Sequence, residues 1–313
     1  MERPLIRETS TSGMVESDLP AYTAEKATWR DYLTLTKPGI NVSNLMATFA
    51  GFWLAGHSGS NLWLLLATLL GTALVIAGGC TLNNVIDRDI DPHMSRTRKR
   101  PVASGKIRPM TALWFGIGLT VTGFAVLLVW VNPLAALLAM VGHFVYVGIY
   151  SLWLKRTTTF NTVVGGISGA VPPMIGWVAV TGTIDLPAWI IFIFMFLWQP
   201  PHFLALAIRR MEEYRAAGVP MLPVVKGFAE TKWQNLLYVA AMVPASLMLV
   251  QTGVVGMLYL IVATVLGLVY IGLSLEGFFT KDDHRWGERM FFYSLVYLTS
   301  MLLVMIIDPL LPI

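Results

Sequence analysis

Apolar runs of about 20 residues, the length that a helix needs to cross a bilayer, recur along almost the whole chain. They lie at about 39–56, 63–87, 110–131, 134–153, 161–181, 188–208, 233–251, 254–276 and 290–308. Only 13% of the 313 residues are charged, about half the share in a typical soluble domain. The sequence therefore predicts an all-α, polytopic membrane protein with nine transmembrane helices.

The lysines and arginines divide the connections between these helices into two sets. All 22 of them lie in the amino-terminal segment and in alternate connections, whereas the intervening connections carry none. Basic residues collect on the cytoplasmic side of membrane proteins. We therefore expect a protein of the cell membrane, inner or plasma, with a cytoplasmic N-terminus, a C-terminus outside and contacts with membrane lipid.

The first 35 residues are polar and contain no apolar core typical of a signal peptide. We expect residues 1–35 to form a disordered cytoplasmic tail, of which residues 28–36 become helical near the membrane surface. Residues 36–313 then form one transmembrane domain. The single cysteine, Cys80, excludes an intramolecular disulfide and a cysteine-based metal site.

An amide and two carboxylates mark the end of the second apolar run. Asn83, Asp87 and Asp91 are spaced at i, i+4 and i+8, so on a helix they share one face. Carboxylate and amide oxygens are ligands for Mg²⁺, which usually keeps one or two carboxylates and completes its shell with substrate phosphates. The alternative is a solvated helix end whose carboxylates pair with nearby arginines.

The loop after this stripe is strongly basic, and Pro92, Pro101 and Gly105 prevent it from forming a continuous helix. Its cations can therefore converge from a folded loop. Arginine forks and lysine ammonium groups both bind phosphate oxygens. We expect Arg98, Arg100 and Lys106 to bind a diphosphate, although cytoplasmic charge alone would also account for each of them.

The pattern from Asn83 to the basic loop resembles the first aspartate-rich motif of the intramembrane aromatic prenyltransferases, the UbiA superfamily. Four further stretches resemble its protohaem IX farnesyltransferases: Leu-Thr-Lys-Pro-Gly at 35–39, Tyr-Ser-Leu-Trp-Leu-Lys-Arg at 150–156, the glycine-rich segment 161–177, and Trp-Gln-Pro-Pro-His-Phe at 198–203. The match extends over nearly the whole chain from Leu35 onward. It implies a nine-helix bundle around a central cavity that opens toward the membrane and is capped by cytoplasmic loops.

The resemblance also implies the activity. A farnesyl group would pass from farnesyl diphosphate to a vinyl group of haem B, with addition of water, to give haem O. Mg²⁺ held by Asn83, Asp87 and Asp91 would be the cofactor, and the haem would be a substrate. A downstream haem-modifying enzyme would be a natural partner, because a lipophilic product benefits from direct transfer, whereas we expect no nucleic-acid partner.

Further site residues follow from the resemblance. It suggests Lys155 or Arg156 as a diphosphate contact, and it places a second acidic motif after the sixth helix. There the chain departs from the superfamily: Arg209 stands about where the first aspartate is expected, and Glu212 and Glu213 follow it. These glutamates would supply one metal ligand, or would only orient the adjacent arginines, and Arg209 itself becomes a candidate for binding the diphosphate.

Histidines in the fourth and sixth helices are candidate ligands for the haem iron. His202 follows Pro200 and Pro201, which we expect to break or kink the sixth helix at membrane depth. His143 is the alternative ligand. A lone histidine in a membrane helix is more often an interior hydrogen-bonded residue, so the structural role stays open for both.

Two other functions compete with this interpretation. A prenyltransferase of a quinone-precursor ring or a chlorophyll-like macrocycle would share the acidic motif, but the four haem-type stretches argue against it. A cation-coupled membrane transporter would hold its coupling site near the bilayer midplane, between repeated halves. Here the acidic stripe lies at the cytoplasmic end of its helix, and no internal repeat is evident.

Overall fold

The chain folds into a bundle of long helices. The structure is a computed structural model that describes residues 27–56 and 61–311. The α-helices are α1 (Trp29–Leu35), α2 (Pro38–Gly56), α3 (Leu62–Ile86), α4 (Pro109–Trp130), α5 (Pro133–Phe144), α6 (Lys155–Thr157), α7 (Asn161–Thr181), α8 (Leu186–Arg209), α9 (Met211–Ala216), α10 (Leu222–Leu247), α11 (Met257–Glu276) and α12 (Asp283–Ile307). The 3₁₀ turns are η2 (Asp87–Asp89), η3 (Asp91–His93), η5 (Met248–Thr252) and η6 (Asp308–Leu310), and η4 (Val145–Leu154) is a π-helix.

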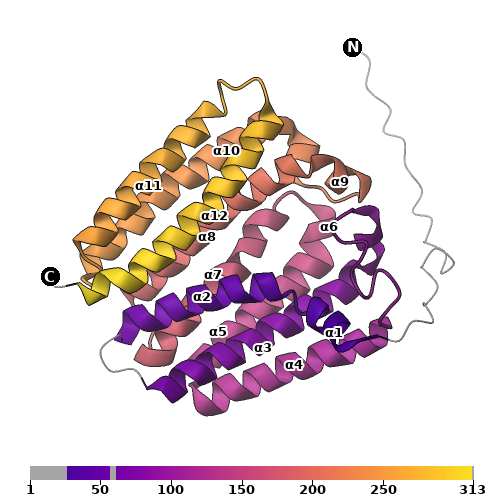
Figure 1. The fold of residues 1–313 in the computed structure, drawn as a ribbon, viewed down its shortest axis with the longest axis horizontal. Coiled ribbons are helices and arrows are strands. Elements are labelled where there is room, and N and C mark those ends of the chain that lie inside the picture. Colours follow the sequence, from indigo (N-terminus) through magenta and orange to yellow (C-terminus); the bar gives the residue numbers. More distant parts are fainter. Residues whose placement is uncertain (1–26, 57–60, 312–313) are drawn as a thin grey trace.

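Eight helical segments in the described part of the chain are long and apolar enough to cross a membrane. The remaining long helix, α2, has 19 residues and carries Asn41, Ser43 and Asn44 near its start, which lowers its mean hydropathy. It lies among the other long helices and packs against α7 (Figure 1). The all-α, polytopic architecture predicted from hydropathy is therefore confirmed.

The contact between α2 and α7 depends on glycine. A β-carbon at Gly51 would overlap the carbonyl oxygen of Pro173, and one at Gly176 would overlap the carbonyl oxygen of Thr48. Small residues at such crossings let two helix backbones approach closely in a membrane. Substitution of either glycine by alanine would therefore force the two helices apart.

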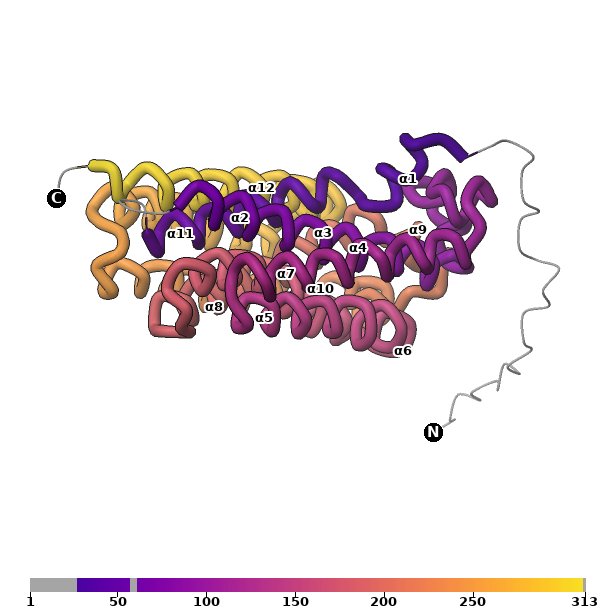
Figure 2. The backbone as a smooth tube through the Cα atoms, turned by 90° about the horizontal axis from the view of Figure 1, so that it is seen from below, coloured from indigo at the N-terminus to yellow at the C-terminus, as the bar shows by residue number. Residues whose placement is uncertain are grey.

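The short α-helices gather at one end of the bundle. Figure 2 shows α1, α6 and α9 at the end opposite the C-terminus, beside the loop that follows α3. Helix α1 lies within residues 28–36, as predicted, while residues 1–26 of the expected tail lie outside the described part of the chain. This end carries the basic loop and the acidic stripe.

Several helix ends differ from the prediction. Helix α12 begins at Asp283 rather than near 290, because Asp282 caps it and its polar first turns lower the hydropathy there. Helix α10 begins at Leu222 rather than 233, with an interruption at Gly227, whose φ of 78° is accessible to glycine. Helix α8 continues through Pro200 and Pro201, so the expected break is absent. A membrane helix tolerates proline where neighbouring groups satisfy the freed backbone.

Candidate functional site

The acidic stripe lies where α3 ends. The helix stops at Ile86, and η2 and η3 carry the chain onward as two 3₁₀ turns, so the expected continuous helix through Asp91 is not formed. Asp87 and Asp91 are nevertheless both fully buried, at 0% exposure. Two carboxylates with no access to water need opposite charges or hydrogen bonds to remain ionised. Both have cationic partners.

Asp87 pairs with a lysine from a different part of the chain. Its Oδ2 oxygen forms a short ion pair with Nζ of Lys155, at the start of α6. Its other oxygen, Oδ1, is buried and has no hydrogen-bond partner among the described residues. A buried carboxylate oxygen without a partner is costly, and it is the kind of atom that a hard cation would bind.

Asp91 is held by an arginine of the basic loop. Nη1 of Arg100 lies 2.8 Å from each carboxylate oxygen, and the hydroxyl of Thr97 donates to the Asp91 carbonyl at 2.8 Å. Burial raises the pKa of the Asp91 carboxyl, and the Arg100 guanidinium opposes that rise. The loop therefore folds back onto the stripe that precedes it.

Asn83 occupies the centre of a polar network. Its side-chain oxygen accepts from Nζ of Lys37 at 2.5 Å, and its amide nitrogen donates to the Ser151 hydroxyl at 2.9 Å. Burial lowers the pKa of the Lys37 ammonium to about 8, and the nearby Arg100 charge acts in the same direction. Lys37 has a φ of 49° at the break between α1 and α2, a conformation that costs free energy in a residue with a side chain.

A π-helix brings Ser151 and Lys155 to the site. In η4 the hydroxyl of Ser151 donates to the carbonyl of Tyr146, five residues earlier, at 2.8 Å. The i→i+5 backbone hydrogen bonding of a π-helix is rare and occurs frequently at functional sites. The rings of Tyr146 and Tyr150 stack in the same segment with centroids 5.9 Å apart. The wider helix therefore turns one polar face of this segment toward Asn83 and Asp87.

Arg156 pairs with Asp89, whereas Lys155 pairs with Asp87. Its guanidinium binds both oxygens of Asp89, at 2.6 and 2.7 Å, and also the carbonyl of Ile86 at 2.7 Å. Asp89 and Arg156 are both partly exposed. This clamp fixes the end of α3 against the start of α6, outside the buried group of Asp87 and Asp91.

The buried group thus combines two carboxylates with three cations: Lys37, Arg100 and Lys155. The excess of positive charge suits an incoming anion such as a diphosphate. In the described residues no three His, Cys, Asp or Glu side chains are placed to enclose a metal. Mg²⁺ would therefore need oxygen ligands from a substrate in addition to Asp87, and the unpartnered Oδ1 of Asp87 fits that use.

The structure does not bring the other candidate cations into this group. Arg98 is exposed on the loop, and Nζ of Lys106 lies 4.0 Å from Asp31 of α1. Arg209 contacts α12 instead, with Nη2 3.5 Å from Glu288 and its guanidinium over the rings of Phe291 and Phe292. Lys106 and Arg209 thus contact α1 and α12, respectively.

The second acidic segment is paired locally. Glu212 binds Arg215 at 2.6 and 2.8 Å within α9. Glu213 binds Arg210 at 2.7 Å and also bonds to Ser95 of the basic loop. These contacts correspond to the alternative in which the glutamates orient adjacent arginines.

The two candidate haem ligands lie in different helix interfaces. Nδ1 of His202 lies 2.7 Å from the Ser294 hydroxyl, and its ring stacks on Trp198 and Phe291 with centroids 4.8 and 4.9 Å away. His143 meets the edge of Phe124 on α4, at 5.8 Å. The structure therefore separates the two: His202 lies between α8 and α12, whereas His143 lies against α4.

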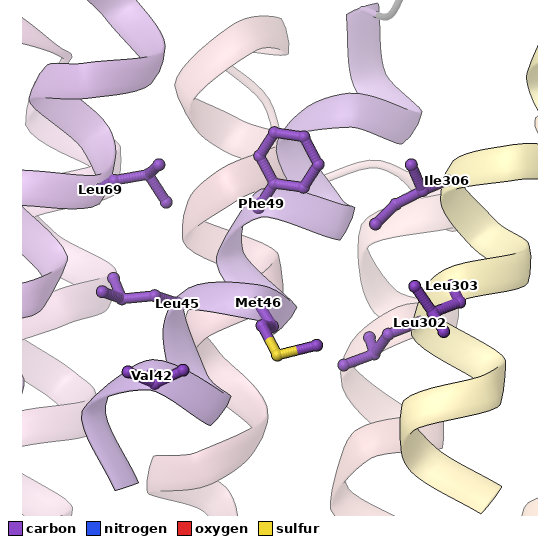
Figure 3. A pocket seen from close by; sticks show the side chains of 8 residues that line it. All are labelled: Val42, Leu45, Met46, Phe49, Leu69, Leu302, Leu303 and Ile306. Carbon is purple, nitrogen blue, oxygen red and sulfur yellow. The ribbon is translucent and has the colours of Figure 1, made fainter. Parts of the chain in front are cut away.

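An apolar groove begins one turn beyond Lys37. Four residues of α2 form one wall, Leu69 of α3 lies beside them, and three residues of α12 face them (Figure 3). Its volume is about 270 Å³, and its lining residues are Val42, Leu45, Met46, Phe49, Leu69, Leu302, Leu303 and Ile306. An aliphatic chain could lie there without desolvating a polar side chain.

Reasoning from sequence missed three residues of the site: Lys37, Ser151 and Asp89. Lys37 and Ser151 lie inside stretches 35–39 and 150–156, which resemble the prenyltransferases, so the signal was present. Their contacts with Asn83 join residues 46 and 68 positions apart, and such pairings depend on tertiary packing.

The chain is similar to known membrane prenyltransferases over most of its length. The profile of the UbiA prenyltransferase family matches residues 44–296. A protoheme IX farnesyltransferase from Alkalihalophilus pseudofirmus is 52% identical over 288 residues, covering 90% of this chain and 91% of that protein. One from Geobacillus kaustophilus is 51% identical over 292 residues, covering 92% and 93%.

Solved structures share the fold at much lower identity. A digeranylgeranylglyceryl phosphate synthase superposes with a TM-score of 0.76 at 19% identity, covering 90% of this chain and 98% of that one. A UbiA homologue from Archaeoglobus fulgidus bound to GPP and Mg²⁺ superposes with a TM-score of 0.61 at 18% identity, covering 88% and 99%. At this identity the likeness establishes the architecture alone.

Proposed function

Because the chain belongs to the UbiA prenyltransferase family, we propose that it transfers the farnesyl group of farnesyl diphosphate to a vinyl group of haem B, giving haem O. The observation that carries the reaction type is the buried pair Asp87 and Asp91, surrounded by three cations. We infer the acceptor from relatives with 51–52% sequence identity that are named protoheme IX farnesyltransferases.

The polar group binds the diphosphate end of the donor. Asp87 and Asp91, with help from the Asn83 oxygen, would hold Mg²⁺, and a fold relative was solved with GPP and Mg²⁺. Bound there, Mg²⁺ would neutralise the charge that develops on the departing diphosphate. Lys155, Arg100 and Lys37 place further positive charge beside the same oxygens.

The apolar helices accommodate the rest of the donor and exclude water. We place the isoprenoid chain in the groove between α2 and α12 (Figure 3). The C1–O bond breaks with its electron pair leaving on the diphosphate, and the vinyl group supplies the electron pair of the new C–C bond. Water then adds to the resulting cation, loses a proton and leaves the hydroxyl of the product.

The acceptor and the topology complete the proposal. His202 is the candidate iron ligand, with His143 as the alternative. The cell membrane holds the protein with the loop end, and hence the diphosphate site, in the cytoplasm. A downstream haem-modifying enzyme would receive the lipophilic product directly.

Product analysis tests the function. Purified protein receives haem B, farnesyl diphosphate and Mg²⁺, beside an Asp87→Asn variant and a Glu230→Gln control that changes an exposed carboxylate. We expect a haem that gains farnesyl and water, lost in Asp87→Asn and retained in the control. Prenylation of a phenolic acceptor without any haem product would overturn the substrate, and a fully active Asp87→Asn would overturn the metal site.

A further inference from the structure

A charged hollow lies at the cytoplasmic end of the bundle, between the end of α8 and the first turns of α12. Its volume is about 540 Å³, and its lining residues are Arg209, Asp282, His284, Arg285 and Glu288. Arg209 pairs with Glu288 within the hollow, whereas the buried carboxylates pair with Arg100 and Lys155. The hollow is therefore separate from the diphosphate site.

The hollow has two arginines and two carboxylates, and the carboxylates do not hold the arginines tightly. Asp282 is the N-cap of α12, where its Oδ1 accepts from the Arg285 backbone N–H at 3.0 Å. Glu288 is 50% exposed, and its oxygen lies 3.5 Å from Arg209, a distance typical of a loose ion pair. Two guanidinium forks, on Arg209 and Arg285, therefore face the hollow and suit carboxylates.

A line of aromatic rings leads from the hollow to a histidine. Arg209 lies over Phe291, Phe291 stacks on His202, and His202 stacks on Trp198. Seven residues separate His202 from Arg209 along α8, a rise of about 10 Å. A flat macrocycle beside these rings would have its metal near the imidazole and its edge near the arginines.

We propose that this hollow binds the propionate carboxylates of the tetrapyrrole acceptor, an inference that rests on the proposed function. Haem carries two propionates on one edge and its vinyl groups on other parts of the ring. Ion pairs of the propionates with Arg209 and Arg285 fix the rotation of the macrocycle about its iron. The vinyl edge is thereby directed away from the hollow and into the apolar interior, so the hollow selects the position that is farnesylated.

Binding of haem B, followed by its visible absorption, tests this site on the full chain in nanodiscs. The variants are Arg285→Gln, Arg209→Gln with Arg285→Gln, and the control Arg289→Gln, which alters an arginine that pairs with Glu276 outside the hollow. We expect the double variant to weaken haem binding by about tenfold or more, the single variant by less, and the control to have no effect. Haem dimethyl ester should bind the parent protein weakly and respond little to the variants. Farnesyl diphosphate affinity should stay unchanged, which also reports an intact fold.

Three results would overturn the inference. Equal haem binding by the double variant and the control would exclude the hollow, and equal losses for haem and its dimethyl ester would exclude the propionates. An effect that disappears when anionic lipid is replaced by zwitterionic lipid would assign the hollow to lipid phosphate. A parent protein that farnesylates haem while the variants bind it normally contradicts this site alone, whereas a parent protein that neither binds nor farnesylates haem contradicts the proposed function as well.

Discussion

Two acidic segments lie at the same end of the bundle and have opposite environments. Asp87 and Asp91 are 0% exposed and pair with Lys155 and Arg100. Glu212 has a 70% exposed side chain and pairs with Arg215, three residues later. Asp87 pairs with a lysine 68 residues away, and Asp91 pairs with the loop that follows it. Glu212 pairs only within α9, and Glu213 bonds to Arg210 and to Ser95 of the basic loop.

The difference shows that burial, rather than residue type, distinguishes the two segments. Ion pairs in water contribute about 0–1 kcal/mol, because solvent screens them and the side chains lose entropy. In a buried group the same charges act through a low dielectric and cost several kcal/mol when one is left unpaired. We therefore propose that the charge stabilisation needed for catalysis comes from the first segment.

Removal of the Asp91 charge should have the largest effect. Asp91→Asn takes a metal ligand from the proposed site and leaves the Arg100 fork without its carboxylate. We expect kcat/KM for farnesyl transfer to fall by about 10³-fold, the scale seen when a group that stabilises transition-state charge is removed. Isothermal titration with Mg²⁺ and a non-hydrolysable farnesyl diphosphate analogue should show weaker joint binding. Unchanged turnover would remove the contrast between the two segments.

Substitution of Lys155, the partner of Asp87, should have the next largest effect, on both stability and rate. Lys155→Met leaves Asp87 buried without its counter-charge, which lowers the free energy of unfolding by about 3–5 kcal/mol. We expect kcat/KM to fall by about 10²-fold. Denaturation in detergent and steady-state kinetics measure the two effects.

A double variant separates the two roles of Lys155. Asp87→Asn combined with Lys155→Met removes both charges, so most of the lost stability should return, because neither group is left unpaired. Activity should stay absent. Lys226→Met, which alters an exposed lysine at the same end of the bundle, is the matched control. A double variant as unstable as the single one would show that the ion pair is not what stabilises the site.

The fold was predictable because segments that lie in the bilayer are apolar and segments that lie in water are polar or charged. Apolar runs predicted the long helices, and the short helix expected within residues 28–36 is α1. The predicted starts of α10 and α12 were wrong, because hydropathy does not detect helical turns that include polar residues outside the apolar run. The Asp282 cap defines the start of α12, whereas α10 is interrupted at Gly227.

The site was predictable only in part, because its residues are joined by packing. Asp87 and Asp91 are distinct in sequence, since two carboxylates at the end of an apolar run are unusual. The approach of Lys37 to Asn83 depends on a strained turn between α1 and α2. That of Ser151 depends on a π-helix. Neither the turn at Lys37 nor the π-helix η4 produces a periodic pattern in the sequence from which it could be predicted.

Ser151 should have a smaller effect than either charged residue. Ser151→Ala removes the acceptor of the Asn83 amide and keeps the volume almost unchanged. Loss of one buried hydrogen bond costs about 1–2 kcal/mol, so we expect about a tenfold decrease in kcat/KM if Asn83 loses its orientation. Thr157→Val, which removes a hydroxyl bonded within its own helix, provides the comparison. Equal kinetics for both variants would place Asn83 outside the reaction.

The second acidic segment should have the smallest effect, and its two glutamates should differ. Glu212→Gln removes an exposed pair within α9, so stability should change by less than about 0.5 kcal/mol and turnover by less than about twofold. Glu213→Gln also weakens a bond to Ser95 of the basic loop, and the loop holds Arg100. It should therefore raise KM for farnesyl diphosphate about two- to fivefold with kcat preserved, as expected when only binding is affected.

A decrease in kcat as large as that of Asp91→Asn would make the second acidic segment a second metal site, and the two segments would then not differ in function. Kinetics across a Mg²⁺ series would detect it, because a lost ligand shifts the Mg²⁺ dependence, whereas a displaced loop does not.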